Sequence, residues 1–199
     1  MYMGPGNYTA TVFQNVTASD VRKLNQNDDQ SFNITEFYLG FNSTNQTEFL
    51  PLGYSGSSKS ALIALNFRGL GLPSYEWNQF TNLLYRVSET LANVLVCDPT
   101  VDGYCYLPKP CSDPDFQILW NYYIKVKFSS IDSYITTNLG SFAVDNTAEG
   151  RCDLYVQRLD GSVQSDKLVL GALWIQNFQA VFNNDLSIQE QTVLLAIAD

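Results

Sequence analysis

The chain has 199 residues, of which 45% are hydrophobic and 14% aromatic, so it can build the core of a globular domain and is not disordered. Its net charge of −9, without a basic cluster, excludes nucleic acid as a partner, because phosphate backbones are bound through Lys and Arg. Histidine is absent, which excludes Ser–His–Asp triads, Cys–His dyads and His-ligated metals within these residues, and we expect no cofactor.

The first elements in chain order are predicted strands. Apolar residues alternate over 31–41 with a slip at Thr35-Glu36, which predicts a strand interrupted by a bulge or short turn. Residues 55–60 are rich in Ser and Gly and are predicted to form a turn or loop. The short apolar run over 61–65 that follows is typical of an interior strand.

One longer amphipathic helix is predicted after Pro73, which suits a first helical turn. Its apolar residues recur at spacings of three and four: Trp77, Phe80, Leu84, Val87 and Leu91. The segment 98–114 is rich in proline and cysteine, so we interpret it as a disulfide-stapled loop. Alternation over Tyr122–Phe128, with Lys125 and Lys127 on the opposite face, predicts a half-exposed strand.

The last third of the chain is also predicted to be β. A strand over 154–159 leads through Asp160-Gly161, a hairpin signal, to a second strand over 167–171. Residues 172–182, a turn at 183–185 and a final apolar strand follow, and no domain boundary or tandem repeat is visible. We therefore expect one domain over residues 1–199.

No apolar run reaches the ~20 residues that a membrane-spanning helix needs, so no membrane span is expected. The segment Met1–Gly6 lacks the charged and apolar regions of a signal peptide. Because other features indicate secretion, we interpret the chain as part of a longer precursor in which residue 1 is not the translational start.

The four cysteines indicate an oxidising compartment. Their even number and clustering favour a disulfide framework, and their separations do not supply the paired C-x₂-C spacing of zinc sites. Of the three pairings that are open, we favour Cys97–Cys105 closing a small loop and Cys111–Cys152 joining distant strands.

Five Asn-X-Ser/Thr sequons, none blocked by proline, fall within the first 47 residues. The alternative is that this segment is simply rich in Asn. Their density favours N-linked glycosylation and a secreted, extracellular or cell-surface location. The candidate acceptors are Asn7, Asn15, Asn33, Asn42 and Asn45, of which the last two are too close for both to be occupied with ease.

The C-terminal pattern resembles the end of pepsin-like aspartic proteases. The run 168–183 has an apolar strand ending in Leu-Gly, a helical turn carrying Trp174 and a hairpin that reaches Phe182-Asn183, and Val193–Ala196 forms the last strand. In that arrangement the glycine lets backbones pack closely and the aromatic ring plugs the end of the barrel.

The resemblance extends upstream in the same order. The run 34–40 is similar to the strand before that family's second active-site loop, 61–73 to the loop, and Trp77 and Phe80 to the helix after it. Cys111 and Cys152 lie where the family's C-terminal lobe carries a disulfide. The resemblance implies a mostly β fold with a single pepsin-like lobe, one of the two lobes that an active enzyme needs.

The implied active-site loop departs from the family motif, in which two apolar residues precede Asp-Thr/Ser-Gly-Thr/Ser. Here Ala64 stands at the aspartate, Asn66 at the glycine, and Leu65 and Phe67 at the hydroxyl positions, followed by Arg68. Two carboxylates must share a proton to activate water, and each lobe supplies one. The resemblance therefore implies no catalytic residue in this chain.

Other candidates have plainer interpretations. Glu76 is the nearest acid downstream but belongs to the predicted helix, and Asp145-Asn-Thr-Ala lacks the glycine and the context of the motif. Arg68 could pair with a carboxylate across a lobe interface, although a surface arginine is the simpler interpretation. Tyr122, Tyr123 and Trp120 could stack on a sugar, although aromatic rings serve cores more often.

We thus expect a non-enzymatic glycoprotein domain with a structural or interaction role, as in a surface coat, an adhesin or a filament. Its partners would be other protein subunits, including copies of itself. Two alternatives stay open: a lobe of an active secreted aspartic endopeptidase, and a protease-like module that binds peptides or inhibits proteases.

Overall fold

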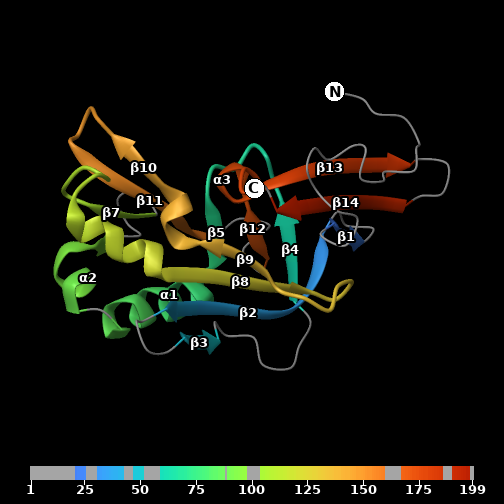
Figure 1. The fold of residues 1–199 in the computed structure, drawn as a ribbon, viewed down its shortest axis with the longest axis horizontal. Coiled ribbons are helices and arrows are strands. Elements are labelled where there is room, and N and C mark those ends of the chain that lie inside the picture. The colour runs from blue at the N-terminus through green and yellow to red at the C-terminus, as the bar shows by residue number, and fades with distance from the viewer. Residues whose placement is uncertain are drawn as a thin grey trace.

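The computed structural model describes residues 21–25, 31–42, 47–51, 59–87, 89–97, 104–159, 167–185 and 190–197. The candidate sequons at Asn7, Asn15 and Asn45 lie outside these residues, as do 55–58 of the loop predicted over 55–60. The last two residues of that predicted loop, Lys59 and Ser60, instead begin the strand β4 (Lys59–Ile63). Strands dominate the fold; the helices α1 (Ser74–Val87) and α2 (Glu89–Val94) lie together, and the short helix α3 (Ala172–Ile175) lies apart from them near β13 (Phe178–Asp185) (Figure 1).

Eleven strands of the described residues form one mixed sheet. Nine of them follow the spatial order β6 (Val96–Cys97), β7 (Tyr104–Leu107), β11 (Arg151–Leu159), β5 (Leu70–Pro73), β12 (Leu168–Leu170), β4 (Lys59–Ile63), β2 (Phe32–Asn42), β8 (Tyr122–Phe128) and β9 (Ile135–Asn138). The other two pair at the sides, β10 (Ala143–Asn146) with β11 and β3 (Thr47–Pro51) with β2.

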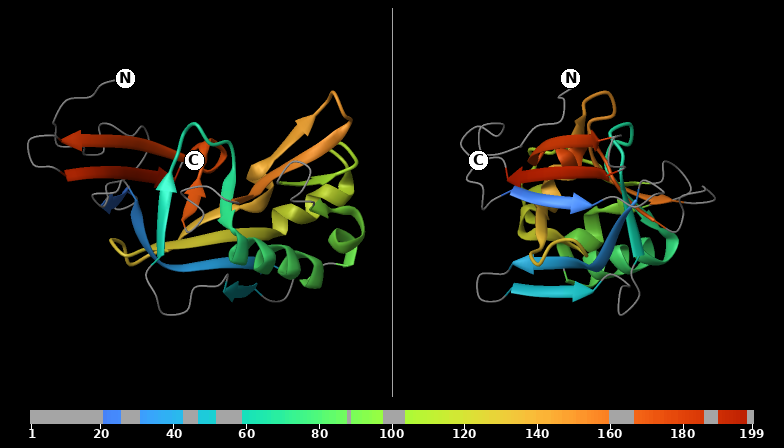
Figure 2. Two further views of the ribbon diagram at one scale, coloured as in Figure 1. Left: turned by 180° about the vertical axis from the view of Figure 1, so that it is seen from behind. Right: turned by 90° about the vertical axis from the view of Figure 1, so that its right-hand side faces the viewer.

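A smaller sheet consists of β1 (Val21–Asn25), β14 (Glu190–Ile197) and β13 (Phe178–Asp185). It lies at one end of the molecule, whereas the β10–β11 hairpin and the helix α2 (Glu89–Val94) lie at the other, as the front and back views show (Figures 1 and 2). The predicted turn at 183–185 is wrong, because these residues extend β13 and pair with β14 from Thr192 to Glu190. The strand continues for as long as its partner can satisfy the backbone groups.

The central strands confirm the alternation seen in the sequence. Along β8 buried and half-buried residues alternate without exception, with Lys125 and Lys127 on the half-buried face. In β2 the register against β8 shifts between Ile34 and Glu36, which is the bulge predicted at Thr35-Glu36.

The predicted helix is two helices. α1 spans Ser74–Val87 and buries Trp77, Phe80 and Leu84, whereas Leu91 belongs to a separate helix, α2, Glu89–Val94. Pro73, predicted for the first helical turn, is instead the last residue of β5, and α1 starts directly after it. The end of a strand suits a residue with a fixed φ and no N–H to donate.

Two further predictions from local sequence are wrong. The stapled loop 98–114 contains a strand, β7, because its residues pair with β11 and bury Cys105 and Leu107. The strands on either side of Asp160-Gly161 do not form a hairpin: β11 and β12 are both neighbours of β5, one parallel and one antiparallel. β12 is buried along its whole length, and such a strand gains more from an interior position between two partners.

That interior position of β12 shapes the middle of the sheet. β12 lies between β4, to which it is parallel, and β5, so the segment 64–69 that joins β4 to β5 must pass over the end of β12. The same segment lies beside α3 (Ala172–Ile175) (Figure 2, left). The predicted strand over 61–65 therefore ends at Ile63.

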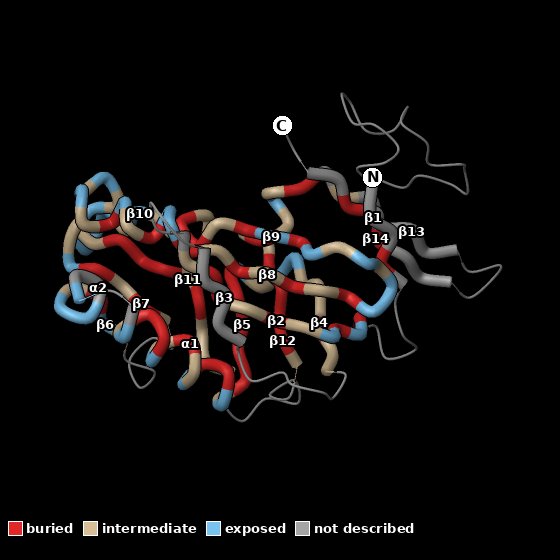
Figure 3. The backbone as a smooth tube through the Cα atoms, turned by 60° about the horizontal axis from the view of Figure 1, so that its bottom comes forward, coloured by how far each residue is buried: buried red, intermediate tan, exposed pale blue. Residues whose placement is uncertain are grey.

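The buried residues that form the core follow the central strands of the large sheet (Figure 3). Trp174, fully buried in α3, packs against Phe178 and Phe128 with ring centroids 4.8 and 6.5 Å apart. Disulfides join Cys97 to Cys105 and Cys111 to Cys152, the pairs favoured from the sequence. Within the described residues, no helix is both long enough and apolar enough to cross a membrane.

Candidate functional site

The loop 64–68, which the sequence singles out, is held against the end of β12 by backbone hydrogen bonds. The Ala64 N–H donates to the Leu170 carbonyl at 3.0 Å, and the N–H groups of Ala172 and Leu173 donate to Phe67 and Arg68, both at 2.8 Å. The 3.1 Å bond from the Phe67 N–H to the Ala64 carbonyl closes a turn. The backbone of this loop is therefore fixed even where its side chains are exposed.

Gly171 makes this close approach possible. A Cβ at this position would lie 2.4 Å from the carbonyl oxygens of Gly69 and Phe67, far inside van der Waals contact. The Gly171 N–H donates to the Gly69 carbonyl at 2.8 Å, which ties the Gly69 end of the loop to the residue before α3. The Leu-Gly pattern of the C-terminal resemblance thus has a direct steric reason here.

The side chains of the loop present a mixed apolar and cationic surface. Leu65 is 58% exposed, Asn66 is exposed, and Ala64 and Phe67 are half-buried. Arg68 is exposed too, but its guanidinium lies 4.1 Å from the centre of the Tyr155 ring and its Nη1 donates to the Tyr155 hydroxyl at 2.7 Å. Such a contact orients the cation without neutralising it.

Tyr155 is part of an aromatic row that the sequence did not indicate as a site. Its ring stacks on Tyr104 of β7 with centroids 5.1 Å apart, and Arg151 lies 4.5 Å from the Tyr106 ring. The residues 151, 153 and 155 of β11 share one face with Tyr104 and Tyr106, while Cys152 and Leu154 are buried on the other. The alternation of polar and apolar residues along 151–157 is the sequence pattern that could have placed these side chains on one face of a strand.

Asp153 is the buried acid in this row. Its carboxylate accepts from Arg151 Nε at 2.7 Å, Asn146 Nδ2 at 3.1 Å and the Tyr104 hydroxyl at 3.4 Å. An ion pair with this many hydrogen bonds satisfies the carboxylate, which therefore has a structural role in the β10–β11 hairpin.

The two acids considered from the sequence are also engaged. Glu76 is buried and its Oε1 lies 2.5 Å from Lys59 Nζ; Lys59 begins β4, roughly 16 Å of extended chain away from Ala64. Asp145 is exposed and accepts from the Cys111 N–H at 2.6 Å. Cys111, Asp145 and Cys152 are close enough to suggest a metal site, but both sulfurs are in a disulfide and neither is a thiolate.

Lys125 and Lys127 belong to a surface cluster with Glu36, Tyr38 and Tyr134. Glu36 accepts from the hydroxyls of Tyr134 at 2.5 Å and Tyr38 at 2.8 Å and lies 3.6 Å from Lys127 Nζ. The Tyr134 hydroxyl, followed by that of Tyr38 and the charge of Lys127, lowers the pKa of Glu36. The same bond raises the pKa of Tyr134 to about 12.

Two sequon asparagines fall on β2. Asn33 is exposed, and the hydroxyl of Thr35, the third residue of its sequon, donates to the Lys127 carbonyl at 3.3 Å. Asn42 is the last residue of β2.

The aromatic residues considered as a sugar platform differ in burial. Tyr122 is fully buried and packs against Phe41, with ring centroids 5.2 Å apart, and Tyr123 is half-buried. Trp120 is 50% exposed and borders a pocket.

The arrangement of these strands defines a mostly β domain with a pepsin-like fold, built on one large mixed sheet. No family model matches the chain, and no curated protein matches it in sequence. Among solved structures, the crystal structure of aspartic proteinase from Irpex lacteus superimposes with a TM-score of 0.57 at 12% identity. The match covers 90% of this chain and 47% of that chain, so this chain spans about half the length of the proteinase.

Proposed function

We propose that this chain is a catalytically inert, pepsin-like C-terminal lobe that serves as a protein-interaction domain of an extracellular glycoprotein. The observation that carries the proposal is the loop 64–68, which joins β4 to β5 over the end of β12 and carries Ala64 where the resemblance puts the catalytic aspartate.

The chemical reason is the missing carboxylate. A water molecule between two lobes is activated by a pair of acids that share one proton, and the methyl group of Ala64 can neither accept a proton nor orient water. The described acids weighed as substitutes, Glu76 and Asp145, are bound to Lys59 and to the Cys111 N–H. The solved neighbour carries the name of an aspartic proteinase, which makes an active lobe the main rival.

The interaction role is supported by the side chains that the loop 64–68 exposes in place of a catalytic carboxylate. Leu65 projects from a rigid backbone with 58% of its surface exposed, and Arg68 is aimed by Tyr155. Exposed apolar residues next to an oriented arginine are typical of protein–protein contacts. We take another copy of this chain as the partner to test first.

The extracellular location is supported by composition and crosslinking. Both disulfides use all four cysteines, which suits an oxidising compartment. The sequons concentrated in the first quarter of the chain supply the glycans.

The first test measures catalysis. Purified protein is incubated at acid pH with a library of peptides, with and without a statine-type inhibitor. We expect no cleavage that the inhibitor blocks. Inhibitor-sensitive cleavage by the wild-type chain would overturn the inert lobe.

The second test measures association by sedimentation velocity over a range of concentrations. We expect the wild-type chain to self-associate and the double variant Leu65→Ser/Arg68→Ala to do so much more weakly. The matched control is Tyr75→Ser/Arg86→Ala on α1, where Tyr75 is also 58% exposed and Arg86 is exposed. A wild-type chain that stays monomeric throughout, or equal effects of both double variants, contradicts the proposed contact.

A further inference from the structure

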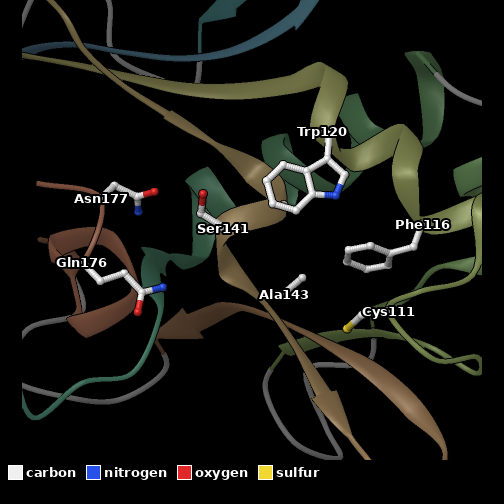
Figure 4. Close-up of a pocket in the computed structure, with 8 residues that line it drawn as sticks. Cys111, Phe116, Trp120, Ser141, Ala143, Gln176 and Asn177 are labelled. Atoms are coloured by element: carbon white, nitrogen blue, oxygen red, sulfur yellow. The ribbon is translucent and has the colours of Figure 1, made fainter. Parts of the chain in front are cut away.

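A pocket of about 340 Å³ opens between elements that lie far apart in the sequence. Two are 3₁₀ helices, η2 (Pro114–Asn121) and η3 (Leu139–Phe142), and the third is the turn that follows α3. Figure 4 shows Trp120 and Phe116 on one side of it and Gln176, Asn177 and Ser141 on the other. The volume is at the lower end of the range for small-molecule sites.

We propose that this pocket binds a neutral sugar ring of a carbohydrate, a function separate from the protein contact at the loop 64–68. The chemistry of its lining carries the inference. The pocket is lined by Cys111, Phe116, Trp120, Gly140, Ser141, Ala143, Gln176 and Asn177. None of these side chains is charged, although the chain has a net charge of −9, so the pocket suits a neutral ligand.

Trp120 supplies the apolar surface. It is the exposed tryptophan of the three, at 50% against 2% for Trp77 and 0% for Trp174. A flat, apolar indole that keeps half its surface in water offers a platform on which the C–H face of a pyranose can stack. Because half of its surface is exposed, Trp120 is not a core residue.

The indole is held in place before any ligand arrives. Gly140 packs directly on it: a Cβ there would lie 2.7 Å from the Cδ2 and Cε2 atoms of Trp120. Asn138 donates from Nδ2 to the Trp120 carbonyl at 2.5 Å and accepts from the Gly140 N–H at 2.8 Å, so one side chain fixes η2 to η3. Binding to such a surface has a low ordering cost.

The polar groups are those that hydroxyls need. Gln176 is exposed and offers a carboxamide, and Ser141 offers a hydroxyl, so each can both donate and accept. Asn177 donates from Nδ2 to the carbonyls of Leu173 and Trp174 at 2.8 and 3.1 Å, which orients its amide. Neighbouring hydroxyls of a sugar require this mixture of donors and acceptors, whereas a charged ligand would require a counter-charge.

Tryptophan fluorescence gives a selective readout, because Trp120 is the tryptophan that meets solvent. The full chain is titrated with the methyl glycosides of glucose, mannose, galactose and N-acetylglucosamine, and with glucuronic acid as the charged comparison. We expect at least one neutral glycoside to change the emission and glucuronic acid to leave it unchanged. A response to glucuronic acid alone would overturn the neutral chemistry.

Variants separate the pocket from the rest of the surface. Gln176→Ala keeps the indole and is expected to raise the Kd about tenfold, and Gly140→Ala to raise it at least as much by displacing the ring. The matched control is Gln117→Ala, an exposed glutamine on η2 that does not line the pocket. Equal effects of Gln176→Ala and Gln117→Ala contradict the site.

The sugar can come from the protein's own N-glycans or from another molecule. The titration is therefore repeated after enzymatic removal of the N-glycans. A response that appears only after removal assigns the pocket to the chain's own glycan, and a response in both states assigns it to an external carbohydrate. The absence of any response in both states overturns the proposal, and none of these three outcomes depends on the contact at the loop 64–68.

Discussion

The guanidinium of Arg68 lies 4.1 Å from the centre of the Tyr155 ring and is hydrogen-bonded to its hydroxyl at 2.7 Å. This contact joins the loop that follows β4 to the exposed face of β11, two segments separated by 87 residues. The ring and the hydroxyl of Tyr155 together give the exposed side chain of Arg68 a fixed direction.

Tyr155→Phe removes the hydroxyl and keeps the ring. Because the contact is exposed, we expect the free energy of unfolding to fall by less than about 1 kcal/mol. We also expect self-association to weaken, because Arg68 loses the hydrogen bond that fixes its direction and keeps only the contact with the ring. Urea unfolding and sedimentation velocity measure the two quantities; a large loss of stability with unchanged association would mean that the pair serves the fold alone.

Two glycines should differ sharply when each is replaced by alanine. At Gly171 the new Cβ meets the Gly69 and Phe67 carbonyls at 2.4 Å, so Gly171→Ala is expected to cost about 3 kcal/mol or more. At Gly150, with φ of 63° and nothing within 4 Å, the cost is only the left-handed conformation, about 1 kcal/mol. Thermal unfolding of both variants checks the order, and similar losses would contradict the close packing over β12.

Two ion pairs of equal length should contribute differently to stability. The N–O distances of Lys59–Glu76 and Lys109–Asp115 are both 2.5 Å, but Glu76 is 1% exposed and Asp115 37%. Lys59→Met leaves the buried carboxylate of Glu76 without its cation and is expected to cost about 3 kcal/mol, the lower end of the range for a broken buried ion pair, because Lys59 is itself 33% exposed. Lys109→Met is expected to cost less than about 1 kcal/mol. Urea unfolding compares them; equal costs would show that burial of Glu76 does not matter.

The cluster around Glu36 predicts a dependence of stability on pH at both ends of the scale. The Tyr134 and Tyr38 hydroxyls lower the pKa of Glu36 below 4.5, so the ionised form is favoured in the fold. Its contribution is present above that ordinary value and is lost as the pH falls through the lower folded pKa. The pKa of Tyr134 is raised from 10 to about 12, so the contribution of the protonated hydroxyl is lost as the pH rises between these values.

Tyr134→Phe weakens the effect at acid pH, because it deletes one donor to Glu36 while Tyr38 and Lys127 remain, and it removes the titrating hydroxyl of Tyr134 at alkaline pH. The unfolding midpoint is measured from acid to alkaline pH for this variant and for Tyr75→Phe, an exposed tyrosine on α1. We expect Tyr134→Phe to flatten the profile at both ends and Tyr75→Phe to leave it unchanged. Profiles that coincide for all three proteins would contradict the role of the cluster.

Glycosylation can be tested at one described sequon. Asn33 is exposed on β2, so its glycan would extend into solvent without disturbing the sheet. We expect Asn33→Gln, made in a secreting eukaryotic host, to lower the mass by one glycan and to leave the unfolding midpoint unchanged. An unaltered glycan mass would show that this sequon is not used.

The sequence by itself determined several of the local elements. The alternation in 31–41 and Tyr122–Phe128 predicts β2 with its bulge and β8, because side chains of a strand alternate between the core and solvent. The spacing of Trp77, Phe80 and Leu84 predicts α1. The pepsin-like order of motifs predicts the fold that the proteinase comparison shows.

Only the tertiary structure decided which distant segments meet. The insertion of β12 between β4 and β5, the contact of Arg68 with Tyr155, and the pocket that joins Trp120 to Gln176 all link residues far apart in the chain. The physical reason is that periodicity reports which face of an element is buried, but not which element covers it. Where a strand such as β12 is apolar on both faces, its neighbours are chosen by packing across the whole sheet.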